Sequence, residues 1–154
     1  MEYTIRSFTE KDAQGVKGLI LSILTKEYPF DKSAYSDSDL DTIGEVYGGV
    51  RDSFFVSEGE GAIVGTVGVK EDEKDSALLR RFFVMPDHRK KGIGSRLLEK
   101  ALDFCKSQGY SKVIFRCTDR MKDAMSLCEK KGFKKEESLD MGGFRIHKLM
   151  ITIT

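Results

Sequence analysis

The 154-residue chain predicts a mixed α+β domain, with a mostly antiparallel sheet, one parallel strand pair and flanking helices. Three apolar strand patterns at 53–58, 62–70 and 77–84 follow one another across short polar turns, as in an antiparallel meander. A helical pattern then separates the strand at 77–84 from the next at 112–117, as a parallel crossover requires. Since the chain carries no repeat and no Pro-rich linker, we expect a single domain over 1–154.

The N-terminal third should supply one strand and two helices. The alternating segment at 3–8 predicts the first strand. Thr9 followed by Asp12 is a capping-box-like start, and the apolar positions after it recur at helical spacing, which predicts a helix over 10–26. A short second helix is expected over 39–47.

The C-terminal half should pack helices on the sheet and end in a hairpin. The apolar stripe after Gly92 predicts an amphipathic helix, with Gly109 just past its end. The stripe consists of Ile93, Leu97, Leu98, Ala101, Leu102 and Cys105. Another helix is predicted over 120–131, and the segments 133–138 and 144–154 should form the final hairpin. The expected order is β-α-α-β-β-β-α-β-α-β-β.

The composition excludes several classes of function. Lys and Arg number 26 against 25 Asp and Glu, and a net charge of +1 argues against nucleic acid as the main partner. Three cysteines without C-x-x-C spacing fit a reducing cytoplasm and provide no metal site. The N-terminus is charged where a signal peptide would be apolar, and no run approaches the roughly 20 apolar residues that span a bilayer. We therefore expect a cytoplasmic protein with no membrane partner.

The segment MPDHRKKGIG at 85–94 joins the end of a strand to the start of a helix. The first turn of a helix leaves amides without intrahelical partners, and its dipole favours an anion there. Gly92 and Gly94 would let a ligand approach the backbone, and the three cations before them add positive charge. The segment therefore predicts a phosphate site, in particular for a diphosphate. It matches neither the P-loop nor the dinucleotide fingerprint, and a basic helix start without a ligand is the alternative interpretation.

Two segments resemble a known family. VMPDHRKKGIG at 84–94 resembles motif A of the GNAT superfamily of N-acetyltransferases, R/Q-x-x-G-x-G/A. AMSLCEKKGF at 124–133 resembles its second signature, A-x-x-L-Y-x-x-x-G-F. The resemblance implies the GNAT-like acyl-CoA N-acyltransferase fold, in which the parallel strand pair is splayed. It also implies acetyl-CoA as cosubstrate, without a metal. The implied cofactor-binding residues are Phe83, Val84, Met85, Arg89, Lys90, Lys91, Gly92, Ile93, Gly94 and Ser95.

The resemblance also implies a reaction, the transfer of an acetyl group to a primary amine by direct attack in a ternary complex. In such a site the diphosphate would lie on the amides of 91–95, and the pantetheine arm would pair with the strand end at 83–85. The backbone amide of Val84 would polarise the thioester carbonyl. The alternative is a module that binds or senses acyl-CoA with little catalytic activity.

The sequence departs from the family's pattern at the positions that usually transfer protons. Cys128 stands where the family has its general acid, a Tyr, and Leu78 stands near the position of a Glu that acts as base. Met121 replaces a frequent Asn. Cys128 could donate a proton, although a Cys on an apolar helix face is commonly a small core residue. Glu71 or Glu73 could act as base through water, although both lie in a polar segment typical of a solvated turn.

The acceptor is expected to bind against the segment at 28–39, the second helix and the final hairpin. The predicted substrate contacts are Tyr28, Tyr35 and Tyr47. Tyr35 or Tyr47 could also replace the missing proton donor. The identity of the acceptor, a small-molecule or peptide amine, stays open.

Two further expectations concern charge and assembly. The segment around the second helix is acidic and would attract a cationic amine, although a solvated loop is the alternative. Its carboxylates belong to Asp31, Asp37, Asp39 and Asp41. The final strand, within 144–154, could pair with a second copy of the chain to form a homodimer.

Overall fold

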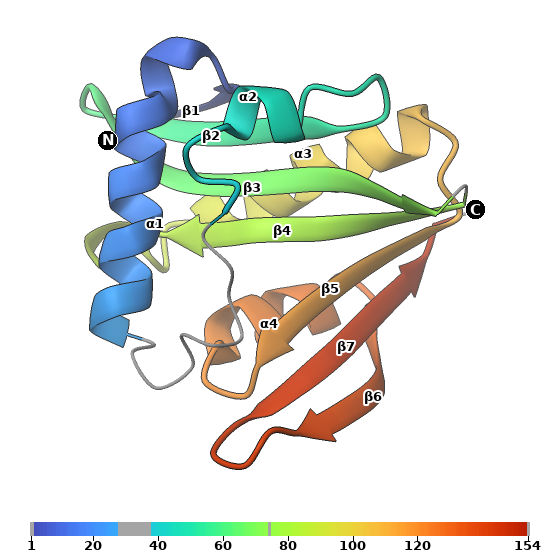
Figure 1. Cartoon of the computed structure of the whole chain (residues 1–154). Helices are drawn as coiled ribbons and strands as arrows, with labels where there is room; N and C mark the ends of the chain where they lie inside the picture. The colour runs from blue at the N-terminus through green and yellow to red at the C-terminus, as the bar shows by residue number, and fades with distance from the viewer. Residues whose placement is uncertain (1, 28–37, 74, 154) are drawn as a thin grey trace.

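A computed structural model describes residues 2–27, 38–73 and 75–153 of the chain. Within these residues seven strands form one sheet in the order β1-β2-β3-β4-β5-β7-β6 (Figure 1). The strands are β1 (Tyr3–Ser7), β2 (Ser53–Gly59), β3 (Ala62–Glu73), β4 (Ser76–Val84), β5 (Lys112–Thr118), β6 (Lys134–Asp140) and β7 (Arg145–Thr152). The helices are α1 (Ala13–Glu27), α2 (Ile43–Val46), α3 (Ile93–Ser107) and α4 (Lys122–Lys130).

The predicted fold class and element order are confirmed. Strands β1 to β4 pair antiparallel, and α3 carries the chain to β5, which pairs parallel with β4. Strand β7 then pairs antiparallel with both β5 and β6. Helices α1 and α2 lie in front of the sheet in the view of Figure 1, and α3 lies behind it.

The first helical segment differs from the prediction in its opening turn. A 3-10 turn over Glu10–Asp12 precedes α1, which is continuous from Ala13. The Asp12 carboxylate accepts a hydrogen bond of 2.9 Å from the Thr9 amide and two from the Arg6 guanidinium. Side-chain bonds therefore stabilise the turn together with one backbone hydrogen bond, from the Asp12 amide to the Thr9 carbonyl at 2.9 Å.

The second helix is shorter than predicted. A turn holds the segment before it, since the Thr42 amide donates to the Asp39 carbonyl at 3.1 Å, and α2 spans only Ile43–Val46. The interior Gly44 and the flanking Gly48 limit helix growth, because glycine loses more backbone freedom than other residues.

The turn between β3 and β4 is also shorter than predicted. Strand β3 continues to Glu73, because Glu71 and Glu73 pair with Ala77 and Ser76 of β4. Both carboxylate side chains are exposed, so backbone pairing rather than side-chain burial extends the strand.

The final hairpin forms as predicted, but its last strand is internal to the sheet. Strand β7 has β5 on one side and β6 on the other. Because both of its edges are paired, the expectation that β7 pairs across a homodimer is wrong. The free edges of the sheet belong to β1 and β6.

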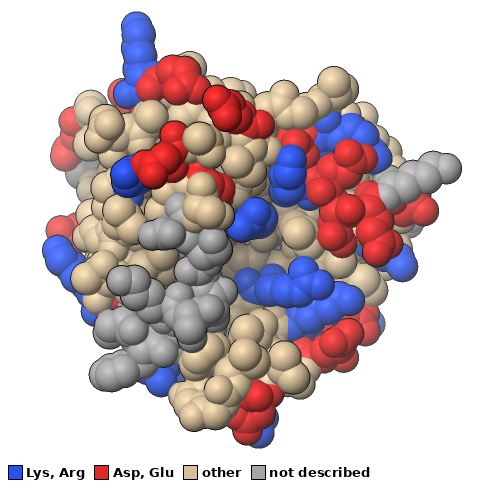
Figure 2. Space-filling model, viewed as in Figure 1, with Lys and Arg blue, Asp and Glu red and all other residues tan. Residues whose placement is uncertain are grey.

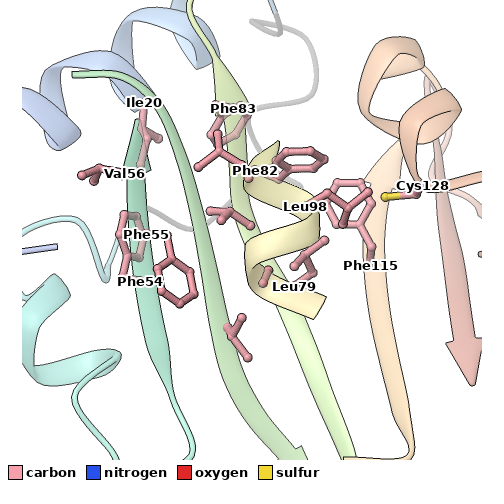
Figure 3. Close-up of a cluster of buried hydrophobic side chains, with 14 of the residues drawn as sticks. Ile20, Phe54, Phe55, Val56, Leu79, Phe82, Phe83, Leu98, Phe115 and Cys128 are labelled. Atoms are coloured by element: carbon pink, nitrogen blue, oxygen red, sulfur yellow. The ribbon is translucent and has the colours of Figure 1, made fainter. Parts of the chain in front are cut away.

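The core lies between the sheet and the helices on both faces. Leu97, Leu98 and Ala101 of α3 are fully buried against the sheet, as the apolar stripe predicts. Ile20 of α1 packs from the other side (Figure 3). Different helices therefore cover the two faces of the sheet. The parallel pair of β4 and β5 lies in the middle of the sheet, between these two layers.

Candidate active site

The parallel strands β4 and β5 pair along only part of their length. Their register runs from Ser76 opposite Lys112 to Leu79 opposite Phe115, and beyond that point the strands diverge (Figure 1). The predicted splay of the parallel pair is confirmed. It exposes one backbone edge of β4 from Arg80 to Val84.

Two hollows meet at this splay. The split hollow, about 210 Å³, lies between the diverging strands. It is lined by Leu78, Leu79, Arg80, Arg81, Phe82, Phe83, Ile114, Phe115, Arg116, Cys117, Thr118, Met121 and Ile146. The helix hollow, about 340 Å³, lies between the end of β4, the start of α3 and α4. It is lined by Phe82, Phe83, Val84, Arg89, Lys90, Gly94, Met121, Asp123, Ala124, Ser126, Leu127 and Lys130. Both hollows share Phe82, Phe83 and Met121, so they adjoin at these residues beside the edge of β4.

The amide of Val84 is directed toward the splay. The Met85 amide donates to the Val64 carbonyl of β3 at 2.8 Å, and Phe83 stands opposite Thr66 of β3. Since backbone groups alternate in direction along a strand, the Val84 amide between them points away from β3, toward the splay. Of the three predicted pairing residues, Val84 therefore has its amide directed toward the splay, whereas the Met85 amide is already paired with β3.

A β-bulge redirects β4 next to Val84. Arg81 and Phe82 together stand opposite Val67 of β3, and Arg81 has a positive φ of 51°. This conformation is costly for a residue other than glycine, by about 1–3 kcal/mol. The Thr66 hydroxyl donates to the Arg81 carbonyl at 2.7 Å and helps to hold the bulge.

A buried ion pair holds the side chain of Arg81. Its Nε donates to Asp39 Oδ2 at 3.1 Å, and its Nη2 donates to the other carboxylate oxygen. The Tyr47 hydroxyl donates to the same Oδ2 at 2.7 Å. Burial raises the pKa of Asp39, but these hydrogen bonds outweigh it and keep that pKa below its ordinary value. Asp39 is thus charged and fully engaged inside the protein.

The start of α3 offers unpaired amides beside the helix hollow. The first backbone hydrogen bond of the helix runs from the Arg96 amide to the Gly92 carbonyl at 3.1 Å. The amides of Ile93, Gly94 and Ser95 therefore precede the helical hydrogen-bond ladder and are available to an anion.

The two glycines of the motif serve different purposes. Gly92 has a φ of 82°, and a Cβ there would meet nothing within 4 Å, so its backbone conformation requires glycine. A Cβ at Gly94 would lie 2.7 Å from Leu127 Cδ1, so Gly94 permits close packing of α3 against α4. Gly94 also lines the helix hollow, and a side chain there would narrow it.

Arg89 is bound by protein groups. Its two terminal nitrogens each donate to the Glu27 carboxylate at 2.7 Å, and its Nε donates to the Val84 carbonyl at 2.9 Å. This arrangement ties the end of α1 to the end of β4. Lys90, with a φ of 62°, and Lys130 of α4 are the lysines that line the helix hollow.

Cys128 lies in the core and lines neither hollow. Its side chain is fully buried, and Figure 3 shows its sulfur directed toward the core around Phe115. Burial raises the pKa of the Cys128 thiol well above its ordinary value. A thiol that is both inaccessible and reluctant to release its proton is a poor general acid, so the structure does not support the predicted catalytic role.

The predicted substrate tyrosines are not assembled at the site. Tyr28 and Tyr35 lie outside the described residues. Tyr47 is 4% exposed, and burial followed by its bond to Asp39 raises its pKa. It lines neither hollow. Tyr47 instead supports the ion pair beside the bulge, a position that does not support the predicted substrate contact.

The predicted acidic acceptor surface is only partly described, and the described part differs from the expectation. Asp31 and Asp37 lie outside the described residues. Asp39 is buried and paired with Arg81, and Asp41 pairs with Lys17. Neither described carboxylate presents a free charge to an acceptor.

No carboxylate or histidine lines the split hollow within the described part of the chain. Glu71 accepts a hydrogen bond from Arg51 at 2.8 Å, and with Glu73 it lies at the paired end of β4, away from the splay. His147 is 6% exposed, and burial lowers its pKa. These groups are therefore not positioned to act as a general base, and Leu78 carries no titratable group.

Several residues of the site were not predicted. Arg80, Arg116 and Lys130 line the hollows, and Glu27 orients Arg89. The consecutive arginines in ALLRRFFV were the available signal, because neighbouring residues of a regular strand point to opposite faces. Two charges in succession within an apolar strand indicate a bulge.

Comparison with known proteins identifies the family. The model of the acetyltransferase (GNAT) family matches residues 19–133. "Probable N-acetyltransferase camello" of Xenopus tropicalis is 37% identical over 84 residues, which cover 53% of this chain and 38% of that protein. "N-acetyltransferase 8" of Homo sapiens is 35% identical over 104 residues, which cover 64% of this chain and 46% of that protein. The chain thus matches less than half the length of these two relatives.

Solved structures share the whole fold. A GNAT-family acetyltransferase from Staphylococcus aureus Mu50 superposes with a TM-score of 0.86 at 21% identity, covering 99% of this chain and 100% of that one. Ard1 from Thermoplasma volcanium superposes with a TM-score of 0.82 at 21% identity, and the match covers 100% of this chain and 99% of that one. Among the described residues, no helix is both long and apolar enough to cross a bilayer. The family model and the splayed strand pair agree, and the chain belongs to the acetyltransferase (GNAT) family.

Proposed function

We propose that this chain transfers an acetyl group from acetyl-CoA to a primary amine by direct attack in a ternary complex. One observation carries the proposal: the two hollows share Phe82, Phe83 and Met121, and Val84, which follows Phe83, lines the helix hollow and directs its amide toward the splay. A donor and an acceptor that enter from the two hollows would face each other at a fixed hydrogen-bond donor. Holding two reactants in line in this way supplies up to roughly 7–11 kcal/mol of the barrier.

The residues around the helix hollow fit acetyl-CoA. The amides of Ile93, Gly94 and Ser95 stand at a helix N-terminus, where a diphosphate binds well. Lys90 and Lys130 add two positive charges at the same hollow. Arg89 positions the loop through Glu27 and the Val84 carbonyl, so its proposed contribution to coenzyme binding acts through these contacts. Acetyl-CoA supplies the acetyl group as a thioester.

The chain would promote transfer mainly by positioning and polarisation. The Val84 amide would donate to the thioester carbonyl oxygen, where negative charge develops. The attacking amine must be neutral, and the arginines of the split hollow disfavour an ammonium ion there, because like charges lower its pKa. Water would carry the proton away, since no described side chain of the hollow is a suitable base. Tyr28 and Tyr35 remain proposed acceptor contacts.

A second candidate is a module that binds acyl-CoA without efficient transfer. Its support is the absence of a titratable base among the described residues of the split hollow and the burial of Cys128. This alternative requires the same coenzyme site, so coenzyme binding alone does not separate the two.

Thiol release from acetyl-CoA separates them. Release would be followed with a chromogenic thiol reagent across a panel of primary amines at several pH values. Transfer predicts release that depends on the amine and increases with pH, because the neutral fraction of the amine increases. Saturable binding of acetyl-CoA without amine-dependent release would establish the binding module instead.

A further inference from the structure

The split hollow is strongly cationic on the side where an acceptor would enter. Arg80, Arg81 and Arg116 line it, and in the described part of the chain no Asp or Glu does. In Figure 2, Lys and Arg side chains gather near the middle of the face that carries β4, β5 and β7. A hollow of this kind would repel an acceptor whose only charge is an ammonium group.

Among the described residues, a carboxylate partner neutralises one of the three arginines, Arg81. The guanidinium of Arg81 donates a hydrogen bond to each of the two carboxylate oxygens of Asp39. Arg80 acts on Asp39 only as a nearby charge that lowers its pKa further. Within the described residues no hydrogen bond or ion pair engages the guanidinium of Arg80 or Arg116.

The register of β4 and β5 places these two arginines on the same face of the sheet. Leu78 of β4 stands opposite Ile114 of β5, so Arg80 and Arg116 each follow by two residues on the same face of the sheet. They flank the point where the strands separate. Lys148 stands opposite Arg116 on β7 and pairs with Glu137 at 3.8 Å, so this lysine adds no uncompensated charge beside Arg116.

We infer that the acceptor carries a carboxylate as well as its primary amine, and that Arg80 and Arg116 bind this carboxylate. The inference rests on the proposed function, because it places the amine of the same acceptor at the splay. Guanidinium groups bind carboxylates through paired hydrogen bonds, and such charged bonds are stronger than neutral ones. The hollow holds about 210 Å³, less than the roughly 300–1,000 Å³ of common ligand pockets, which favours an acceptor of amino-acid size.

The inference is tested with amino acids and their amides. Each amino acid and its amide differ only in that the amide lacks the carboxylate. For each acceptor separately, kcat/KM of the variant is compared with kcat/KM of wild type. Arg80→Gln and Arg116→Gln should each lower kcat/KM about 10-fold or more for the amino acids, as expected for a lost charged hydrogen bond. The same variants should change kcat/KM for the amides by less than about 2-fold.

Lys112→Gln is the matched control. Lys112 lies on the same strand and the same face as Arg116, but at the paired end of β4 and β5. The Lys112→Gln variant removes the same unit of charge as the arginine variants. It should leave kcat/KM unchanged for both the amino acids and the amides. Equal losses for acids and amides in the arginine variants, or a loss in Lys112→Gln as large as theirs, would overturn the inference.

The design separates this inference from the proposed function. If no amine in the panel accelerates thiol release, the transfer proposal fails, and calorimetric binding of the same pairs to the CoA-bound protein decides the inference. Wild type should then bind the acids more tightly than the amides, and Arg80→Gln should abolish that preference. Equal binding of acid and amide by wild type would refute carboxylate recognition.

Discussion

The helix hollow and the split hollow are built in different ways. The helix hollow uses regular geometry: a strand, a glycine with positive φ and the first turn of α3. The split hollow depends on a β-bulge, and a buried ion pair between Arg81 and Asp39 holds the bulged strand. Local sequence rules therefore describe the proposed coenzyme side, whereas contacts between distant segments shape the proposed acceptor side.

The largest effect should come from the ion pair beside the bulge. Asp39→Ala leaves the buried Arg81 guanidinium without its carboxylate, and such a loss costs about 3–5 kcal/mol of unfolding free energy. Denaturant unfolding measures the change. Asp41→Ala, which removes an exposed carboxylate paired with Lys17, should cost less than about 1 kcal/mol. Similar costs for the two variants would mean that the bulge does not depend on Asp39.

The same ion pair should make the free energy of unfolding depend on pH in the acidic range. The pKa of Asp39 is lower in the folded protein than in the unfolded chain, so its stabilising contribution is fully present above about pH 4. That contribution is lost as pH falls through the lowered folded pKa. Unfolding free energy measured between pH 7 and pH 3 should decline less in Asp39→Asn than in wild type. An identical decline in both proteins would contradict this assignment.

The glycines at the two ends of α3 provide a closely matched comparison. Gly92 and Gly109 have φ values of 82° and 81°, and a Cβ at either would meet nothing within 4 Å. Alanine at either position should cost about 1–2 kcal/mol of unfolding free energy through backbone strain. Only Gly92→Ala should also weaken acetyl-CoA binding, by several-fold in calorimetry. Equal affinities of the two variants would remove Gly92 from the proposed coenzyme site.

The smallest effect should come from Cys128. If it is a core residue, Cys128→Ala should cost about 1 kcal/mol of unfolding free energy and leave the pH profile of kcat unchanged. Cys105→Ala is the control, because Cys105 is also fully buried and burial raises its pKa to about 12. A shift in the pH profile that occurs only in Cys128→Ala would restore the role of general acid.

Much of the fold could be predicted because its elements follow local patterns. The stripe of α3 and the short turns of the meander gave the correct elements and the parallel crossover. Local patterns could not predict that β7 lies between β5 and β6, because the order of strands in a sheet depends on contacts between distant segments. The extent of α2 was likewise overestimated, because its neighbouring turn depends on tertiary contacts of Asp39.

The residues of the candidate site likewise fall into those that local sequence predicts and those that tertiary contacts determine. The helix start at Gly92 and the edge of β4 at Val84 were located from the sequence. Arg80 and Arg116 were missed because they come together only through the register of β4 and β5. Cys128 and Tyr47 were assigned to the site by position in the chain, but burial separates them from both hollows.

Hydrogen exchange at the edge of β4 tests the central claim most directly. The Val84 amide should face the bound thioester, whereas the adjacent Met85 amide already donates to the Val64 carbonyl at 2.8 Å. On saturation with acetyl-CoA, exchange at Val84 should slow about 10-fold or more, and exchange at Met85 should change little. An unchanged exchange rate at Val84 in the saturated protein would contradict the account.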